Sequence, residues 1–138
     1  MSFGEAQRAV VVDASVAVDL LLGDAAWAGR WTDWAEADVM VLAPAHFGAE
    51  IANALLRSVQ LPAAEVASAL HRLARAGVEV VDRQLPGMLE AIGLADQHGL
   101  TVYDALYLQL ALDVGGELAT LDANLARAAE AEGVSRVR

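Results

Sequence analysis

The sequence predicts an α/β domain of three layers, in which helices cover both faces of a mostly parallel β-sheet. Short apolar segments alternate along the chain with longer segments of helical pattern. The short segments are apolar on both faces, which is typical of strands in a parallel sheet that is covered on each side. No repeat, linker or low-complexity stretch divides the 138 residues. We therefore expect a single domain over residues 1–138 with a sizeable core.

The first half of the chain contains two predicted strands and four predicted helices. Residues 9–12 are apolar and β-branched, which favours a buried strand. Asp13-Ala14-Ser15 is a turn with the chemistry of a helix start, and we expect Ser15 to be the N-cap. Pro44 and Pro62 suit the first turn of a helix. The expected elements are a strand at 9–12, helices at about 15–22 and 25–37, a strand at 39–42, and helices at 44–58 and from 62 to Gly77.

The second half follows the same alternation, with helices that end at glycine. Gly99 and Gly115-Gly116 each follow a helical pattern, and glycine is the commonest residue just beyond a helix C-terminus. The expected elements are a strand at 78–81, helices at 86–98 and 103–113, a strand at 118–121, a helix at 123–132 and a short final strand at 133–137.

Composition narrows the classes of function. The chain is 57% hydrophobic, contains no Cys and carries a net charge of −10, and all nine of its basic residues are Arg. Disulfides and thiolate metal sites are excluded, and a phosphate-rich ligand would need a bound metal or a local Arg patch to overcome the negative field. Asp13 and Asp19 interrupt the apolar run at 9–22, and no stretch reaches the ~18 apolar residues of a membrane span. We expect a cytoplasmic protein.

Two acidic residues follow predicted strands. Asp13 follows Ala9–Val12 directly, and Asp122 follows Leu118-Ala119-Thr120-Leu121. In open parallel sheets ligands bind beyond the carboxyl ends of the strands, so one site for both residues is expected. The alternatives are a turn role for Asp13 and a capping role for Asp122.

Two further acids lie on predicted helices. Glu50 borders the inward face that is marked by Phe47 and Ile51, although its carboxylate would also reach water from there. Asp104 lies in the first turn of a nearly all-apolar helix, where an acid complements the helix dipole by ~0.3–1 kcal/mol. A buried acid at that position needs a metal or hydrogen-bond donors.

Clustered carboxylates indicate a divalent metal site. Oxygen donors suit Mg²⁺ or Mn²⁺, and the chain has few cations to pair with buried acids. His46, His71 and His98 have no ligand spacing such as HxxxH, so zinc is disfavoured and a surface or helix-end position is expected for each.

Four motifs occur in order and cover nearly the whole chain. They are Val11-Val12-Asp13-Ala14-Ser15-Val16, Pro44 with Glu50-Ile51-Ala52-Asn53-Ala54-Leu55, Tyr103-Asp104-Ala105-Leu106-Tyr107-Leu108-Gln109-Leu110-Ala111, and Ala119-Thr120-Leu121-Asp122 with Leu125. Together these motifs resemble those of the PIN-domain proteins, and more narrowly of the VapC toxins of bacterial toxin–antitoxin pairs.

The resemblance implies a Mg²⁺- or Mn²⁺-dependent endoribonuclease with an RNA substrate, an antitoxin partner and frequent homodimerisation. It also implies an acidic quartet formed by Asp13, Glu50, Asp104 and Asp122, supported by Ser15 and Thr120. We expect Asp13 and Asp104 to hold metal directly, and Glu50 and Asp122 to hold it or its waters. Asp19 and the large acidic excess are departures from what an RNA-cutting protein requires.

Other readings remain open at this point. A haloacid-dehalogenase-type phosphotransferase requires D-x-D, whereas Ser15 occupies the second position, and a Lys near its acids, whereas this chain has none. Nucleotide-binding glycine motifs are absent. The non-enzyme alternative is a degenerate PIN module that only binds a partner protein.

Two groups of surface candidates complete the predictions. Trp27, Trp31 and Trp34 share one helix face, for which we favour core packing over a groove for an antitoxin helix. Candidates for contact with an RNA backbone are Arg57, Arg72, Arg75 and Arg83, each of which would equally suit a solvated helix.

Overall fold

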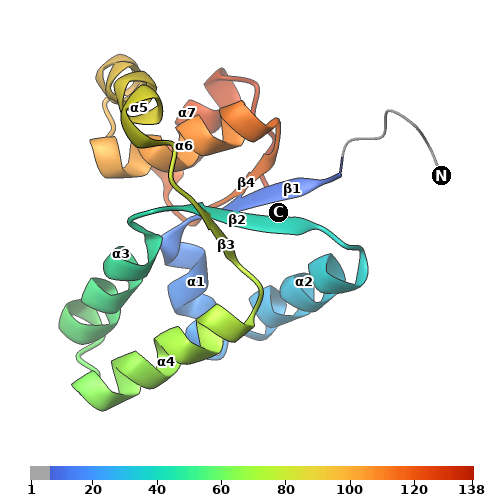
Figure 1. Ribbon diagram of the computed structural model, residues 1–138, viewed down its shortest axis with the longest axis vertical. Helices are drawn as coiled ribbons and strands as arrows, with labels where there is room; N and C mark the ends of the chain where they lie inside the picture. Colours follow the sequence, from blue (N-terminus) through green and yellow to red (C-terminus); the bar gives the residue numbers. More distant parts are fainter. Residues whose placement is uncertain (1–6) are drawn as a thin grey trace.

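Four parallel strands form the central sheet of the computed structural model, which describes residues 7–138. Their order across the sheet is β3-β2-β1-β4 (Figure 1). The chain builds outward from β1 to β2 and β3, and then returns to place β4 on the other side of β1. The order therefore reverses between β1 and β4, which is where open α/β sheets bind ligands. The strands are β1 (Ala9–Val12), β2 (Met40–Pro44), β3 (Glu79–Val81) and β4 (Glu117–Ala119).

Helices cover both faces of the sheet, which confirms the predicted three layers. Figure 1 shows α1 to α4 on one face and α5 to α7 on the other. The first layer contains α1 (Ala14–Leu21), α2 (Ala25–Glu36), α3 (Phe47–Asn53), which continues as a π-helical turn (Ala54–Ser58), and α4 (Ala63–Arg75). The second layer contains α5 (Gln84–His98), α6 (Val102–Val114) and α7 (Ala123–Ala131).

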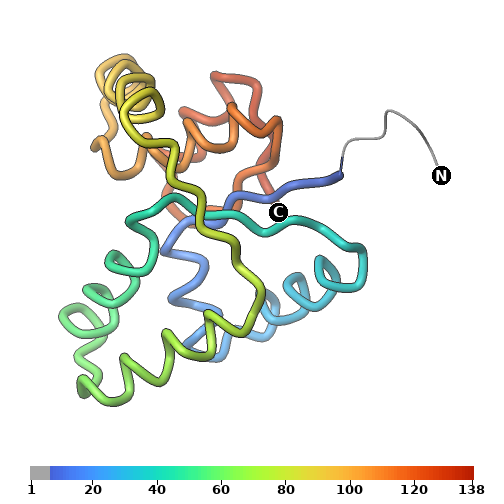
Figure 2. Tube along the Cα trace, in the orientation of Figure 1, coloured from blue at the N-terminus to red at the C-terminus, as the bar shows by residue number. Residues whose placement is uncertain are grey.

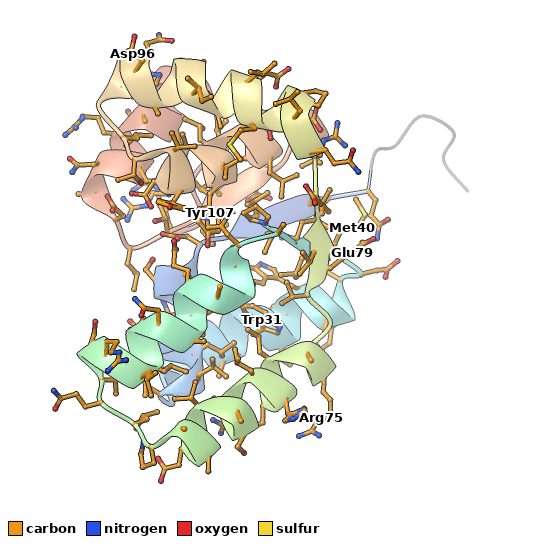
Figure 3. All side chains as sticks on the ribbon, turned by 60° about the vertical axis from the view of Figure 1, so that its left-hand side comes forward. Trp31, Met40, Arg75, Glu79, Asp96 and Tyr107 are labelled. Carbon is orange, nitrogen blue, oxygen red and sulfur yellow. The ribbon has the colours of Figure 1, made fainter. Side chains whose placement is uncertain are left out.

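Strand β1 carries no polar side chain because it lies in the core of the fold. Val10, Val11 and Val12 are fully buried, since β1 has a neighbour on each side and helices above and below. The three tryptophans of α2 also belong to the core, with exposed fractions of 3–8%. The indole N–H of Trp31 donates to the carbonyl of Ala76, 3.1 Å away, and joins α2 to the end of α4. Figure 3 shows Trp31 in the interior beneath the sheet. Core packing of this stripe is confirmed.

Pro44 does not begin a helix as predicted. It is the last residue of β2, paired in register with Val81, and α3 begins only at Phe47. The fixed φ of proline also suits an extended strand, and its missing N–H is tolerated at a strand end. Regular helical spacing from Phe47 and Ile51 would also place Ser58 on the inward face. Ser58 is exposed, because the π-helical turn over Ala54–Ser58 changes the rotation of the last residues.

Three smaller predictions were also wrong. Ser15 is not the N-cap of α1, because Asp13 occupies that position and the helix begins at Ala14. Residues 133–137 form no strand, only an isolated parallel bridge between Leu118 and Arg136. β3 is not apolar on both faces, since it is an edge strand whose Glu79 is exposed. Within residues 7–138, no helix has the length and apolarity to cross a membrane.

Candidate active site

Asp13 is a buried carboxylate at the point where the strand order reverses. It follows β1 and is 4% exposed. Its backbone N–H donates to the carbonyl of Ala119 at the end of β4, 2.9 Å away. Although Asp13 occupies the N-cap of α1, its side chain makes no capping hydrogen bond. Its Oδ2 instead accepts from the hydroxyls of Thr120 at 2.7 Å and Ser15 at 2.9 Å.

Ser15 and Thr120 connect the ends of β1 and β4. Thr120 is 1% exposed, and its Oγ1 accepts from the backbone N–H of Asp122 at 3.0 Å. The hydroxyl oxygen of Ser15 accepts from the backbone N–H of Leu121 at 3.1 Å. Both hydroxyls therefore use their donor on Asp13 and their acceptor on the segment after β4. This arrangement fixes the Asp13 carboxylate against the segment that leads to Asp122.

Asp122 has a structural role beside any role in a site. Its Oδ1 accepts from the backbone N–H groups of Asn124 at 2.8 Å and Leu125 at 3.0 Å, which caps α7. Capping of this kind typically contributes about 1 kcal/mol. The capping role is compatible with the site role expected from the sequence. Burial is the main cause of the raised pKa of Asp13, and the negative charge of Asp122 raises it further.

Two aromatic residues that sequence reasoning missed lie beside Glu50, and one of them, Tyr107, is hydrogen-bonded to it. Tyr107 of α6 donates from its phenol to Oε1 of Glu50, 3.1 Å away. His46 lies with its Nε2 3.8 Å from Oε2 of Glu50 and packs edge-on against the Tyr107 ring at 5.0 Å. Figure 3 shows Tyr107 on the inner side of α6, facing α3 across the edge of the sheet. The available signals were the i, i+4 spacing of His46 and Glu50, and the position of Tyr107 one turn after Asp104.

Asp104 approaches from the start of α6. Its backbone N–H donates to the Thr101 hydroxyl at 3.1 Å, so the capping role at this helix start belongs to Thr101. Asp104 is partly buried. The negative charges of Asp13 and Asp122 both act on it, which places it in the same cluster.

The acids destabilise one another's charged forms. Burial raises the pKa of Asp13, which the Thr120 and Ser15 hydrogen bonds partly oppose. Burial, followed by the charge of Asp13, raises the pKa of Glu50 and also that of Asp104. Burial lowers the pKa of His46 and raises that of Tyr107, so both are neutral near pH 7. The structure thus brings all four predicted acids into one electrostatic cluster.

The cluster is a loose one in the described part of the chain. Over residues 7–138, no three His, Cys, Asp or Glu side chains lie close enough together to form a ready-made metal cage. Its donors are carboxylate oxygens, with the hydroxyls of Ser15 and Thr120 already engaged on Asp13.

Comparison with known proteins gives matches over most of the chain. The PIN domain family matches over residues 10–131. Ribonuclease VapC3 of Mycobacterium tuberculosis is 40% identical over 128 residues, with 86% of each chain covered. Among solved structures, Mycobacterium tuberculosis VapC20, a Sarcin-Ricin loop cleaving toxin, superposes with a TM-score of 0.71 at 19% identity. The match covers 94% of this chain and 98% of that one. A toxin–antitoxin complex from Klebsiella pneumoniae superposes with a TM-score of 0.62 at 16% identity. That match covers 82% of this chain and 86% of the other. At these identities the two structures support the fold.

Proposed function

This chain belongs to the PIN-domain family, and from that premise we propose that it is a metal-dependent endoribonuclease, the toxin of a toxin–antitoxin pair. The observation that carries the proposal is the buried Asp13 carboxylate, which two hydroxyls orient at the point of strand reversal. Its charge acts on Glu50 and Asp104, and the charge of Asp122 acts on it. The relatives named as ribonucleases and toxins support the same activity.

The donor set fits Mg²⁺ or Mn²⁺. Both ions prefer oxygen ligands, and Mg²⁺ in particular usually binds through one or two carboxylates while keeping several waters. A loose cluster of acids is therefore compatible with a hydrated ion. The raised pKa values of Asp13, Glu50 and Asp104 are compatible with this, because a bound cation would offset both the burial and the mutual repulsion that raise them.

Each residue has a proposed role in the reaction. Asp13 and Asp104 bind the metal directly, and Glu50 and Asp122 hold it or its waters. When bound there, such an ion would supply activation of a water and charge stabilisation for the leaving oxygen of an in-line displacement at phosphorus. Ser15 and Thr120 hold Asp13 Oδ2 in a fixed orientation, so that the carboxylate reorganises little when it takes up a ligand.

Partners form part of the proposal. The toxin–antitoxin complex among the structural neighbours supports an antitoxin for this chain. A cytoplasmic location is part of the same proposal. We also propose a homodimer. Leu85, Leu89 and Ile92 recur at i, i+4 and i+7 on α5 with exposed fractions of 65%, 59% and 48%. An apolar stripe of this kind is typical of a protein contact surface.

Cleavage by the purified chain tests the proposal. A structured RNA incubated with Mg²⁺ or Mn²⁺ should be cut at internal positions, EDTA should stop cleavage, and added metal should restore it. Asp13→Asn, purified in parallel, should be inactive while giving the same circular dichroism spectrum. A folded wild-type chain that binds metal and cleaves no RNA would instead support the degenerate, partner-binding alternative.

A further inference from the structure

Three of the nine arginines gather around one groove beside the acidic cluster. The groove has a volume of about 500 Å³ and lies between α7 and the C-terminal segment. Figure 2 shows that segment returning from α7 to the sheet. The arginines that line it are Arg127, Arg136 and Arg138, and Glu130 lies among them. The chain as a whole has a net charge of −10, whereas the side chains that line this groove have a positive net charge.

Arg136 connects the groove to the proposed active site. Its guanidinium Nη2 donates to the backbone carbonyl of Thr120 at 3.3 Å, and the hydroxyl of Thr120 donates to Asp13. Thr120 therefore links Arg136 in the groove to the buried Asp13 carboxylate. Arg127 is held by a hydrogen bond from its Nη2 to Asn124 Oδ1 at 3.0 Å, which orients it from the first turns of α7.

The groove arginines keep their charge available. The arginine salt bridges found within residues 7–138 belong to Arg8 and Arg83, which pair with Glu117 and Asp113. Glu130 is the one acid in the groove lining, against three arginines. A guanidinium uses its planar set of donors to bind phosphate oxygens in pairs, which makes arginine well suited to a nucleic-acid backbone.

The direction of the C-terminal segment places the arginines at the correct edge of the sheet. The segment runs parallel to β4, since the Leu118 N–H donates to the Ser135 carbonyl and the Val137 N–H donates to the Leu118 carbonyl, each at 2.9 Å. Its later residues therefore lie toward the carboxyl edge, where α7 also begins after Asp122. The groove and the acidic cluster share that edge.

We propose that this groove binds the sugar–phosphate backbone of the RNA strand on one side of the cleavage position, with Arg127 and Arg136 paired to phosphates. This inference rests on the proposed ribonuclease function and adds where the strand lies. It also answers how so acidic a chain holds RNA, because the contact is local. Arg57, Arg72 and Arg75 belong to the helical layer on the opposite face of the sheet, and Figure 3 shows Arg75 at the outer end of α4.

Binding without cleavage tests the groove. The affinity for a short fluorescein-labelled single-stranded RNA of mixed sequence is measured by fluorescence anisotropy in EDTA over a series of KCl concentrations. Each phosphate contact contributes a slope of about −0.7 to the dependence of log K on log salt for single strands. Arg127→Gln and Arg136→Gln should each reduce the slope by about that amount, and the double variant by about 1.4. Arg127→Gln leaves the hydrogen bond to Thr120 intact, so its effect reports on the groove alone.

Arg72→Gln and Arg75→Gln are the matched controls, because they change the net charge equally on the other face. If they reduce the slope as much as the groove variants do, or if neither groove variant changes it, the proposal is overturned. Equal loss of binding to a labelled polyglutamate peptide would also overturn it, since the surface would then take any polyanion. If the groove variants still cleave RNA and bind it with unchanged affinity, the groove does not bind RNA, and the ribonuclease proposal still stands. If the wild-type chain binds RNA through the groove and yet cleaves no RNA, the groove proposal stands and the ribonuclease proposal falls.

Discussion

The hydroxyl of Thr120 donates to Oδ2 of Asp13 across 2.7 Å, although 107 residues separate the two in sequence. Both residues are almost fully buried, and the bond joins the ends of two neighbouring strands. The same hydroxyl accepts from the backbone N–H of Asp122, so one side chain fixes both the Asp13 carboxylate and the turn that leads into α7. Thr120 is thus a positioning residue for the proposed site and a structural link in the fold.

Thr120→Val tests that link, because valine keeps the shape and removes the hydroxyl. The variant leaves the Asp122 N–H and one Asp13 interaction unsatisfied, and should lower the free energy of unfolding by about 1–3 kcal/mol. It should also reduce metal-dependent cleavage. Urea unfolding and RNA cleavage measure the two effects. Thr120→Ser keeps the hydroxyl and is the control; if it performs no better than Thr120→Val, the hydrogen bond is not the cause.

The raised pKa values of the acids predict how stability changes with pH in the absence of metal. The ordinary pKa values of Asp13, Glu50 and Asp104 are 3.8, 4.5 and 3.8, and folding raises the pKa of each of them. Between the ordinary and the raised pKa the folded state binds more protons than the unfolded state, so stability falls as pH rises through that window. In EDTA the chain should therefore be more stable below the window than above it, as measured by urea unfolding over a pH series.

Asp13→Asn provides the matched comparison for this titration. It removes one charge of the cluster, so the variant should be more stable than the wild type at neutral pH in EDTA and should lose that advantage at acidic pH. Mg²⁺ should stabilise the wild type at neutral pH and have a smaller effect on the variant. If the variant is less stable than the wild type at every pH, the charge of Asp13 does not destabilise the folded state.

The sequence determined the architecture and part of the site for identifiable reasons. Burial on both faces leaves a clear apolar signature, so β1 and Asp13 at its end were predictable. The boundary at Pro44 was not, because proline is compatible with both a helix start and a strand end. The contact between Tyr107 and Glu50 was not predictable either. It depends on how α6 packs beside α3, and spacing within one helix carries no information about a partner 57 residues away.

Tyr107→Phe tests whether the phenol positions Glu50. The ring is fully buried, so phenylalanine preserves the packing and removes only the hydrogen bond to Oε1. The variant should bind Mn²⁺ several-fold more weakly, as measured from the free-ion signal in electron paramagnetic resonance, with little change in its circular dichroism spectrum. Tyr103→Phe is the control on the same helix, because Tyr103 is 65% exposed. Unchanged Mn²⁺ affinity in Tyr107→Phe would remove Tyr107 from the positioning residues.

Leu89→Asp tests the proposed dimer through the exposed stripe of α5. Leu89 lies at the centre of that stripe, between Leu85 and Ile92, on a helix that packs on α6 at the outside of the fold (Figure 1). Because burying an unpaired carboxylate in an apolar contact is strongly unfavourable, the variant should be monomeric at concentrations where the wild type is dimeric. Light scattering coupled to size-exclusion chromatography measures the mass. Leu22→Asp introduces the same charge at another exposed leucine, and should leave the dimer intact. A monomeric wild type, or dissociation by both variants alike, would exclude α5 as the contact surface.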